Sequence, residues 1–305
     1  CDADPESIED TIKVLERNRI ITEVYSDDDI LSYEEQKRFS RQINYFTEFL
    51  GGEREGVIAQ KKVKDSHIIV FGCGAIGGGI AIELAMAGVN SFTLYDFDLV
   101  EKSDVSRHIF FSKDDIGIPK VESLKKAILS INPQCSIKCL NASMKPSDDV
   151  ENIITSGDFV VNTMDEPYIG YTASKISRVC VKHNLPHFIA GGFDAHLAST
   201  GELIVPYLTP CVECYSGYFK EKLKDWKPKK HPVKTRYVEI GGLASMSLFS
   251  VSYAVIEILK YIAGLVDTNE EYKVRGELLF QDLNLTYLNV KKNIECPICG
   301  EGSLL

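Results

Sequence analysis

A glycine-rich turn and the acidic residue that follows it are the first candidates for chemistry in this sequence. Residues 70–111 read VFGCGAIGGGIAIELAMAGVNSFTLYDFDLVEKSDVSRHIFF, in which Gly72, Gly74 and Gly77 make a GxGxxG motif between an apolar stretch and a helical one. Glycines at this spacing let the backbone approach a phosphate group at the start of a helix. Asp96 follows about twenty residues later, where a carboxylate can accept both hydroxyl groups of a ribose. The motif therefore predicts a nucleotide site.

Charged residues near this motif suggest which nucleotide is bound. Arg107 and Lys120 are spaced so that both can reach phosphates at the carboxyl edge of a sheet, and Asp98 and Asp104 crowd the same rim. Asp165 ends another predicted strand at that edge, where its carboxylate could hold Mg²⁺. Two cations, a metal-binding acid and a ribose acid describe a triphosphate site for nucleotidyl or phosphoryl transfer. A surface cluster of ion pairs, or a strand–helix turn without a ligand, remains open as the alternative.

Four cysteines form the strongest local metal signal. The nine cysteines include two close pairs, CVEC (Cys211 and Cys214) and CPIC (Cys296 and Cys299). Two such pairs can close a tetrahedral Cys₄ site, for which Zn²⁺ is the expected ion and a structural role the expected function. A redox role for CVEC is the alternative, but it would not require the second pair. Free thiols and the lack of a recognisable signal peptide lead us to expect a cytoplasmic protein.

Composition limits the classes of function. The chain has 305 residues and a formal net charge of −10, which argues against a general nucleic-acid binder. The basic stretch KPKKHPVK (227–234) is either a solvated loop or a local contact patch. The apolar run 243–265 contains Glu257 and Lys260, so we predict a long buried helix and no membrane span. Because the chain begins with Cys1, we expect further residues upstream.

The elements that must position these residues alternate along the chain. Apolar strands are predicted at 67–72, 91–98, 136–140, 158–165 and 186–192, and helices at 77–88, 119–131 and 168–183. This alternation implies parallel β–α units in a doubly wound, mostly parallel, Rossmann-like sheet, and hence an α/β fold. After it, 197–208 and 276–292 suggest antiparallel strands.

The N-terminal part has a different pattern. Residues 6–24 predict an amphipathic helix that runs into a short strand, and 32–50 a second helix. Gly51, Gly52 and Gly56 are expected to break that second helix.

Taken in order, these motifs resemble the ThiF/MoeB/E1 superfamily, whose members adenylate the C-terminal carboxylate of ubiquitin-like proteins. The resemblance extends from Arg38 to the C-terminus. The matching motifs are RFSRQI (38–43), GCGAIG (72–77), YDFDLVEKSDVSR (95–107), DDIGIPKVES (114–123), TMDEP (163–167) and the two CxxC pairs.

The resemblance implies a role for each charged residue of the site. The glycine turn would bind ATP, Asp96 the ribose, and Arg107 and Lys120 the phosphates, while Asp165 would bind Mg²⁺. Arg41 would reach the triphosphate from the opposite subunit, so the working enzyme would be a homodimer. A carboxylate of the substrate would attack the α-phosphate and expel pyrophosphate, with no nucleophilic side chain needed.

Three departures from the family pattern qualify this assignment. Asp104 stands where the family has asparagine, so it could bind metal, face away or tune the substrate. His108 stands where the family has glutamine. Residues 216–242 contain no cysteine, whereas full E1 enzymes carry one in a corresponding loop or domain. We therefore expect adenylation without a thioester step.

Within the superfamily the sequence is most similar to the peptide-modifying members, the microcin C (MccB-like) and pantocin (PaaA-like) enzymes. On this resemblance, 1–31 is the remnant of a winged-helix-like segment that clamps a precursor peptide, and 32–305 is the adenylation domain with its zinc site. The basic residues of the 216–242 loop would suit an acidic peptide. They are Lys227, Lys229, Lys230, Lys234 and Arg236.

The predicted function is Mg-ATP-dependent adenylation of a carboxylate on a ribosomally made peptide, in the biosynthesis of a peptide antibiotic or other natural product. The product would be a peptidyl-AMP or a peptide that cyclises after activation. Three alternatives remain. They are activation of a ubiquitin-like sulfur carrier that ends in Gly-Gly, a non-catalytic nucleotide-binding subunit, and an NAD-dependent oxidoreductase.

Overall fold

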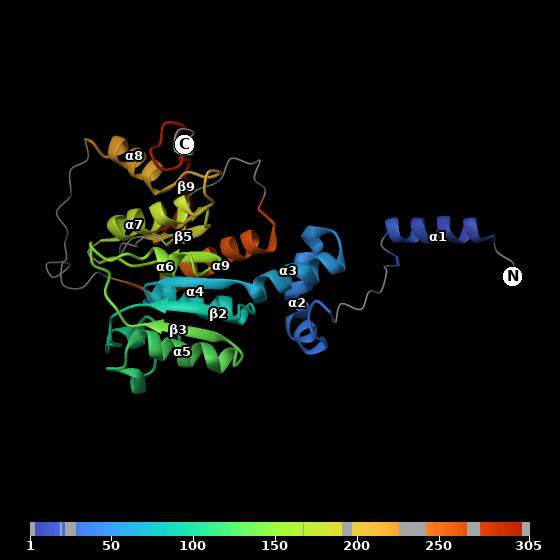
Figure 1. Ribbon diagram of the computed structural model, residues 1–305, viewed down its shortest axis with the longest axis horizontal. Coiled ribbons are helices and arrows are strands. Elements are labelled where there is room, and N and C mark those ends of the chain that lie inside the picture. The colour runs from blue at the N-terminus through green and yellow to red at the C-terminus, as the bar shows by residue number, and fades with distance from the viewer. Residues whose placement is uncertain are drawn as a thin grey trace. The chain divides into compact units, whose positions relative to one another are not determined.

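The computed structural model describes residues 4–18, 20–21, 29–166, 168–190, 197–225, 242–266 and 275–300. The chain divides into two compact units, Cys1–Ile58 and Ala59–Leu305, which are described separately. The helices are α1 (Pro5–Arg17), α2 (Tyr33–Leu50), α3 (Glu53–Asp65), α4 (Ala75–Met86), α5 (Lys120–Ile131), α6 (Glu151–Ile154), α7 (Ile169–Lys182), α8 (Val212–Lys222) and α9 (Ala244–Ala263), with 3-10 turns η1 (Asp104–Ser106) and η2 (Lys113–Asp115) (Figure 1). The strands are β1 (His67–Phe71), β2 (Ser91–Tyr95), β3 (Ser136–Leu140), β4 (Phe159–Asn162), β5 (His187–Ile189), β6 (Leu197–Ser199), β7 (Glu202–Ile204), β8 (Arg275–Leu279) and β9 (Leu285–Leu288).

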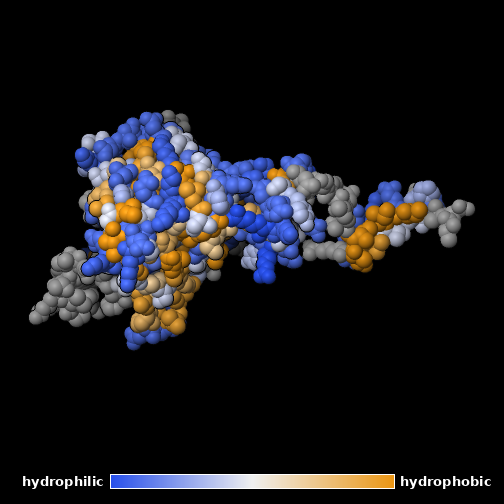
Figure 2. Space-filling view, turned by 90° about the horizontal axis from the view of Figure 1, so that it is seen from below, coloured by the Kyte–Doolittle hydropathy of each residue, from blue (hydrophilic) through white to orange (hydrophobic). Residues whose placement is uncertain are grey.

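The first unit contains the two helices predicted for the N-terminal part, and the first of them, α1, is strongly amphipathic. Ile8 and Ile12, one helical turn apart, are 46% and 42% exposed. Figure 2 shows hydrophobic side chains along one side of this helix. The predicted helix is confirmed over Pro5–Arg17. The short strand predicted to follow it falls mostly outside the described residues.

Helix α2 has clear start and stop signals. Ser32 and Glu35 form a capping box at its start, which satisfies backbone N–H groups that have no partner within the helix. Gly51 ends the helix in the left-handed conformation, at φ 84°. The predicted helix over 32–50 is therefore confirmed.

The prediction that Gly56 breaks the helical pattern is wrong, because Gly56 lies inside α3. A Cβ at this position would lie 2.8 Å from the carbonyl oxygen of Ile43 on α2. The glycine therefore lets the two helices pass close together. Val57 of α3 packs with Leu31, Phe39 and Ile43 in the hydrophobic cluster of this unit.

A six-stranded sheet forms the centre of the second unit. The strand order is β3-β2-β1-β4-β5-β7, and every neighbouring pair is parallel except β5 and β7. The chain adds β2 and β3 on one side of β1 and then returns to add β4 and β5 on the other side, as expected for a doubly wound α/β sheet. The predicted fold class and the five predicted parallel strands are confirmed.

Helices cover both faces of this sheet. On one face Ile69 and Phe71 of β1 pack with Ile154 of α6 and with Ile176 and Cys180 of α7. The opposite face carries α4, which contacts both α5 and α9. The central strands β1 and β4 are therefore buried on both faces, whereas the edge strand β3 has exposed residues.

Helix α9 corresponds to the predicted long buried helix. By length and composition it could cross a membrane. In the structure it packs on α4, where a Cβ at Gly79 would lie 2.7 Å from Val251 Cγ2. Val251, Ala254 and Ile258 are fully buried. The burial of one face supports its place as a core helix of this unit.

A smaller antiparallel sheet completes the second unit. Its strand order is β6-β8-β9. The antiparallel strands predicted for 197–208 and 276–292 are confirmed, although the first stretch divides between the two sheets as β6 and β7.

Candidate active site

A pocket opens where three adjacent strands of the large sheet end. Gly72 follows β1, Asp96 follows β2, and Thr163 to Asp165 follow β4, so these residues meet at one edge of the sheet. Ligands of open α/β sheets bind at this edge, where the strand order reverses. The charged residues that line the pocket are Asp96, Asp98, Asp104, Arg107, Lys120, Asp165 and Glu166.

The three glycines of the motif do different things. Gly72 has φ 89°, and a Cβ there would lie 2.5 Å from Thr163 Oγ1. A Cβ at Gly77 would lie 2.0 Å from the carbonyl oxygen of Gly72, so Gly77 allows the turn to close and does not line the pocket. At Gly74, by contrast, no described atom lies within 4 Å of a Cβ.

Gly74 therefore leaves open space at the start of α4. It is the residue before the helix and has no capping side chain, and the first turn contains no acidic residue. The N–H groups of the first turn have no intrahelical partners and favour an anion. An atom of a bound phosphate could occupy the space that a side chain would fill.

Asp96 is buried below this turn. Its Oδ2 accepts a hydrogen bond from the N–H of Cys73 at 2.6 Å, and its Oδ1 accepts one from the N–H of Asp98 at 2.8 Å. Burial raises the pKa of Asp96, although these two N–H groups and Lys120 partly offset the effect. The bonds fix the carboxylate at the pocket wall and leave lone pairs for a ligand hydroxyl.

The two cations of the pocket already have carboxylate partners. Lys120 Nζ lies 2.8 Å from Asp98 Oδ2, and the Arg107 guanidinium lies 2.8 Å from Asp104 Oδ1. Burial on its own lowers the pKa of Lys120, but Asp98, Asp104 and Asp96 outweigh it and raise that pKa. Lys120 is therefore a fixed positive charge at neutral pH.

The two residues that depart from the family pattern lie next to each other. Asp104 is 2% exposed, and its Oδ2 also accepts the N–H of Glu101 at 2.9 Å. Its carboxylate is thus occupied by protein groups. His108 Nδ1 lies 2.7 Å from the carbonyl oxygen of Asp104, so Nδ1 donates that bond. Burial lowers the pKa of His108, which keeps the ring neutral.

Asp165 and two residues missed by sequence reasoning form the β4 side of the pocket. Asp165 is exposed and has no hydrogen-bond or ion-pair partner among the described residues, so its oxygens are available to a cation. Glu166 also lines the pocket, and only its place beside Asp165 in TMDEP could have indicated it. Thr163 Oγ1 donates to the carbonyl of Gly72 at 3.0 Å, which ties β4 to the glycine turn.

Arg41 lies on α2 in the first unit. Its expected action on the triphosphate of an opposite subunit therefore stays a prediction. The five basic residues predicted to contact an acidic peptide lie at 227–236, outside the described residues. The start of the loop predicted at 216–242 is instead helical, because α8 extends to Lys222.

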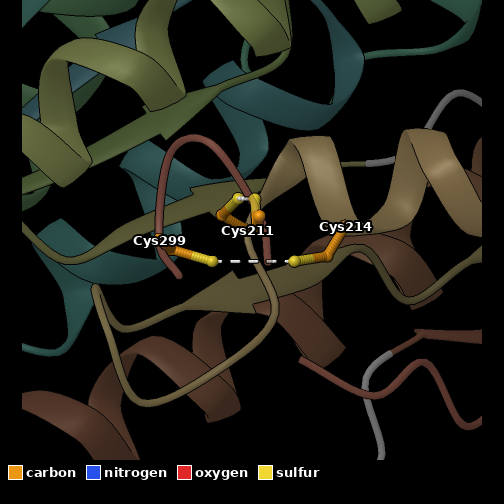
Figure 3. Close-up of side chains that lie close together, drawn as sticks. Cys211, Cys214 and Cys299 are labelled. Atoms are coloured by element: carbon orange, nitrogen blue, oxygen red, sulfur yellow. Dashed lines mark hydrogen bonds between the residues drawn. The ribbon is translucent and has the colours of Figure 1, made fainter. Parts of the chain in front are cut away.

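The four cysteines of the CxxC pairs meet in one buried cluster. All four sulfur atoms lie within 4.8 Å of one another. The Sγ atoms of Cys211 and Cys296 are 3.6 Å apart, as are those of Cys214 and Cys299. Figure 3 shows Cys214 and Cys299 pointing toward one another, with Cys211 beside them.

These distances fit a tetrahedral metal ion and exclude disulfides. Sulfur atoms bound at about 2.3 Å to one Zn²⁺ are about 3.8 Å apart, whereas a disulfide needs about 2.05 Å. The hydrogen bonds among these sulfur atoms lower the pKa of Cys214 and raise the pKa of Cys211. A metal ion would bind each cysteine as its thiolate. Four sulfur ligands leave no open position, so the cluster could hold a structural ion.

A family model, curated protein sequences and solved structures that are similar to this chain all indicate one family and one fold. The model of the ThiF family matches residues 39–298. The vegetative HesA protein of Trichormus variabilis is 29% identical over 90% of this chain and 92% of its own length. The molybdopterin-synthase adenylyltransferase of Escherichia coli is 28% identical over 89% of this chain and 99% of its own length. A crystal structure of E. coli MccB with ATP has a TM-score of 0.71 at 21% identity, covering 98% of this chain and 82% of that one.

Proposed function

This chain belongs to the ThiF family and is an ATP-dependent adenylyltransferase, and we propose that its substrate is a carboxylate of a short, ribosomally made peptide. The activated peptide would be an intermediate or product of natural-product or antibiotic biosynthesis. No thioester step is part of the proposal.

The observation that carries the proposal is that the carboxyl ends of β1, β2 and β4 meet the N-terminus of α4 at one pocket. The open space at Gly74, the carboxylate of Asp96 and the cations Arg107 and Lys120 all face one pocket. A hydride-transfer site would not require two cations next to the glycine turn. A nucleoside triphosphate uses all of these features, because its phosphates need cations and its ribose needs an acceptor.

In the proposed reaction, a carboxylate oxygen of the peptide bonds to the α-phosphorus of ATP. The bond from that phosphorus to the bridging oxygen breaks, and pyrophosphate leaves with the electron pair. Arg107 and Lys120 stabilise the charge that develops on pyrophosphate, while Asp96 accepts the ribose hydroxyls. The start of α4 receives phosphate oxygens at Gly74. The reaction would be accelerated because the site holds the two reactants in position and presents fixed positive charges to the phosphates.

Two metal ions are part of the proposal. Asp165 would hold Mg²⁺, which neutralises phosphate charge when bound. Cys211, Cys214, Cys296 and Cys299 would hold Zn²⁺ in a structural role, because no ligand position remains open. Since none of the eight described cysteines forms a disulfide, we also propose a cytoplasmic location.

The proposed assembly is a homodimer in which Arg41 acts on the triphosphate of the opposite subunit. Support for a peptide substrate comes from the segment before α2, in which α1 carries the exposed apolar side chains of Ile8 and Ile12. MccB, whose fold matches 98% of this chain, has been crystallised in complex with N-formylated MccA. We propose that residues 1–31 take part in peptide binding.

A second candidate function is activation of a ubiquitin-like sulfur carrier that ends in Gly-Gly. The molybdopterin-synthase adenylyltransferase of E. coli favours it, because 99% of that enzyme is covered by the match. Both candidates share the first chemical step and differ in the carboxylate that enters the pocket.

Pyrophosphate exchange into ATP tests both candidates. The enzyme with Mg²⁺ is given pools of acidic peptides or a carrier protein ending in Gly-Gly. Exchange that requires peptide supports the proposal, and exchange that requires the carrier supports the second candidate. Asp165→Ala should abolish exchange, whereas Asp114→Ala, an exposed acid of η2 outside the pocket, should not. ATP binding without exchange for any substrate would favour a non-catalytic subunit.

A further inference from the structure

The carboxylate of Asp104 lies between the two cations of the nucleotide pocket. One oxygen, Oδ1, is 2.8 Å from the Arg107 guanidinium. The other, Oδ2, is 3.9 Å from Lys120 Nζ and also accepts the N–H of Glu101 at 2.9 Å. A single buried carboxylate is therefore bound to the backbone and faces both positive charges.

This arrangement restricts the cations before any ligand arrives. The side chain of Asp104 is 3% exposed, so water screens its charge weakly. The side chain of Arg107 is 39% exposed, and its other bond is longer, 3.4 Å from Nε to the carbonyl oxygen of Ser103. The hydrogen bond from Glu101 fixes the carboxylate, which in turn fixes the guanidinium. Neutral His108, bonded to the main chain of the same residue, adds no competing positive charge.

The same carboxylate also competes with the ligand. Five acidic side chains line the pocket against two cations, namely Asp96, Asp98, Asp104, Asp165 and Glu166 against Arg107 and Lys120. A polyphosphate must share both cations with carboxylates that already hold them. Repulsion from a fixed negative charge grows with each negative charge that the ligand adds.

We propose that Asp104 is a positioning residue that holds Arg107 and Lys120 in place and, by its charge, weakens the binding of polyphosphate more than that of monophosphate. This inference rests on the proposed nucleotide site. In this role the aspartate does not bind phosphate. It lowers the affinity of the enzyme for ATP and pyrophosphate, and it keeps the two cations ordered for turnover and for the release of pyrophosphate.

Asp104→Asn tests the charge with almost no change in shape. The amide oxygen can still accept the N–H of Glu101, but the negative charge is gone. We expect the ratio of the AMP to the ATP dissociation constant to rise about tenfold, because ATP gains most from the loss of repulsion. Turnover in pyrophosphate exchange should fall about tenfold, since Arg107 loses its carboxylate partner and keeps the longer bond to Ser103. KM for ATP and kcat should thus fall together.

Two further variants make the test specific. Asp115→Asn removes another buried carboxylate from the same part of the chain, one that accepts from Ser112 and lies outside this pocket. It should leave the AMP-to-ATP ratio within about twofold of the wild type. Asp104→Glu keeps the charge and should keep the wild-type ratio while turnover falls, and it serves in its own right if Asp104→Asn does not fold.

The outcomes separate the inference from the proposed function. An unchanged ratio in Asp104→Asn, or the tenfold rise already present in Asp104→Glu, would overturn the positioning role while nucleotide binding stands. Wild-type enzyme that binds neither ATP nor AMP would overturn the proposed function and this inference with it.

Discussion

Replacing Gly74 and Gly77 by alanine, one at a time, should separate nucleotide binding from folding. A methyl group at Gly77 would lie 2.0 Å from the carbonyl oxygen of Gly72, which is backbone and cannot rotate away. Overpacking of this kind costs about 3 kcal/mol, and a domain of this size loses about 2–4 °C of Tm for each kcal/mol. Gly77→Ala should therefore lower Tm by about 6–12 °C.

The methyl group at Gly74 meets no described atom within 4 Å. Its φ of −75° suits alanine, which stabilises by several tenths of a kcal/mol, but alanine is a poorer residue than glycine before a helix by a similar amount. Tm should thus change by no more than about 2 °C. Because the methyl group fills the space assigned to phosphate, the affinity for ATP should fall at least about tenfold, or about 1.4 kcal/mol.

Thermal melts and titration calorimetry with Mg-ATP measure the two quantities on the same samples. Gly217→Ala is the matched control, because Gly217 is exposed on α8, no described atom lies within 4 Å of a Cβ there, and it lies outside the nucleotide pocket. It should raise Tm slightly and leave ATP affinity alone. Wild-type ATP affinity in Gly74→Ala would refute the placement of phosphate at the start of α4.

Three other perturbations test separate parts of the structure. Cys296→Ser should lower bound zinc below one ion per chain and lower Tm by more than about 5 °C, and zinc analysis that finds no metal in the wild type would contradict the proposed ion. Asp165→Asn should leave Tm within about 1 °C and reduce pyrophosphate exchange at least about 100-fold, and exchange near the wild-type rate would remove Asp165 from the Mg²⁺ site. Burial lowers the pKa of His187 to about 4 in the folded protein, whereas the unfolded chain has a value of about 6.5. The contribution of this residue to the free energy of unfolding is therefore complete above about pH 6.5, and about 3 kcal/mol of it should be lost as pH falls toward 4. Urea unfolding near pH 7 and near pH 4.5 should show a smaller acid loss in His187→Gln, and equal losses would refute this assignment.

The sequence predicts the large sheet and the place of the pocket well, for a simple physical reason. Each core strand is a short apolar run that ends in a polar or glycine residue, and parallel strands bring such ends to one edge. Asp96 and Asp165 could therefore be placed together without a structure. The cysteine cluster was equally predictable, because two CxxC pairs have few other uses.

Other features depend on contacts between distant residues. Gly56 has the local pattern of a helix breaker, but the approach of α2 to α3 gives it a place inside a helix. Gly74 and Gly77 share one motif, and only the position of the Gly72 carbonyl distinguishes the open site from the packed one. Whether Asp104 faces phosphate or protein depends on the turn at η1, which a family motif does not determine.

The cysteine cluster also changes how the chain is connected. With a metal ion on its four thiolates, Cys211 and Cys296 become joined across 85 residues of sequence. In the chain-entropy treatment of cross-links, closing a loop of this length lowers the conformational entropy of the unfolded ensemble, which stabilises the folded state by about 4.5 kcal/mol. It also means that a protease cut inside the loop would leave both fragments attached through the metal. Such a nicked protein should run as one species under native conditions, held also by the packing of α9 on α4 and the pairing of β8 with β6, and a chelator should lower its unfolding midpoint in urea.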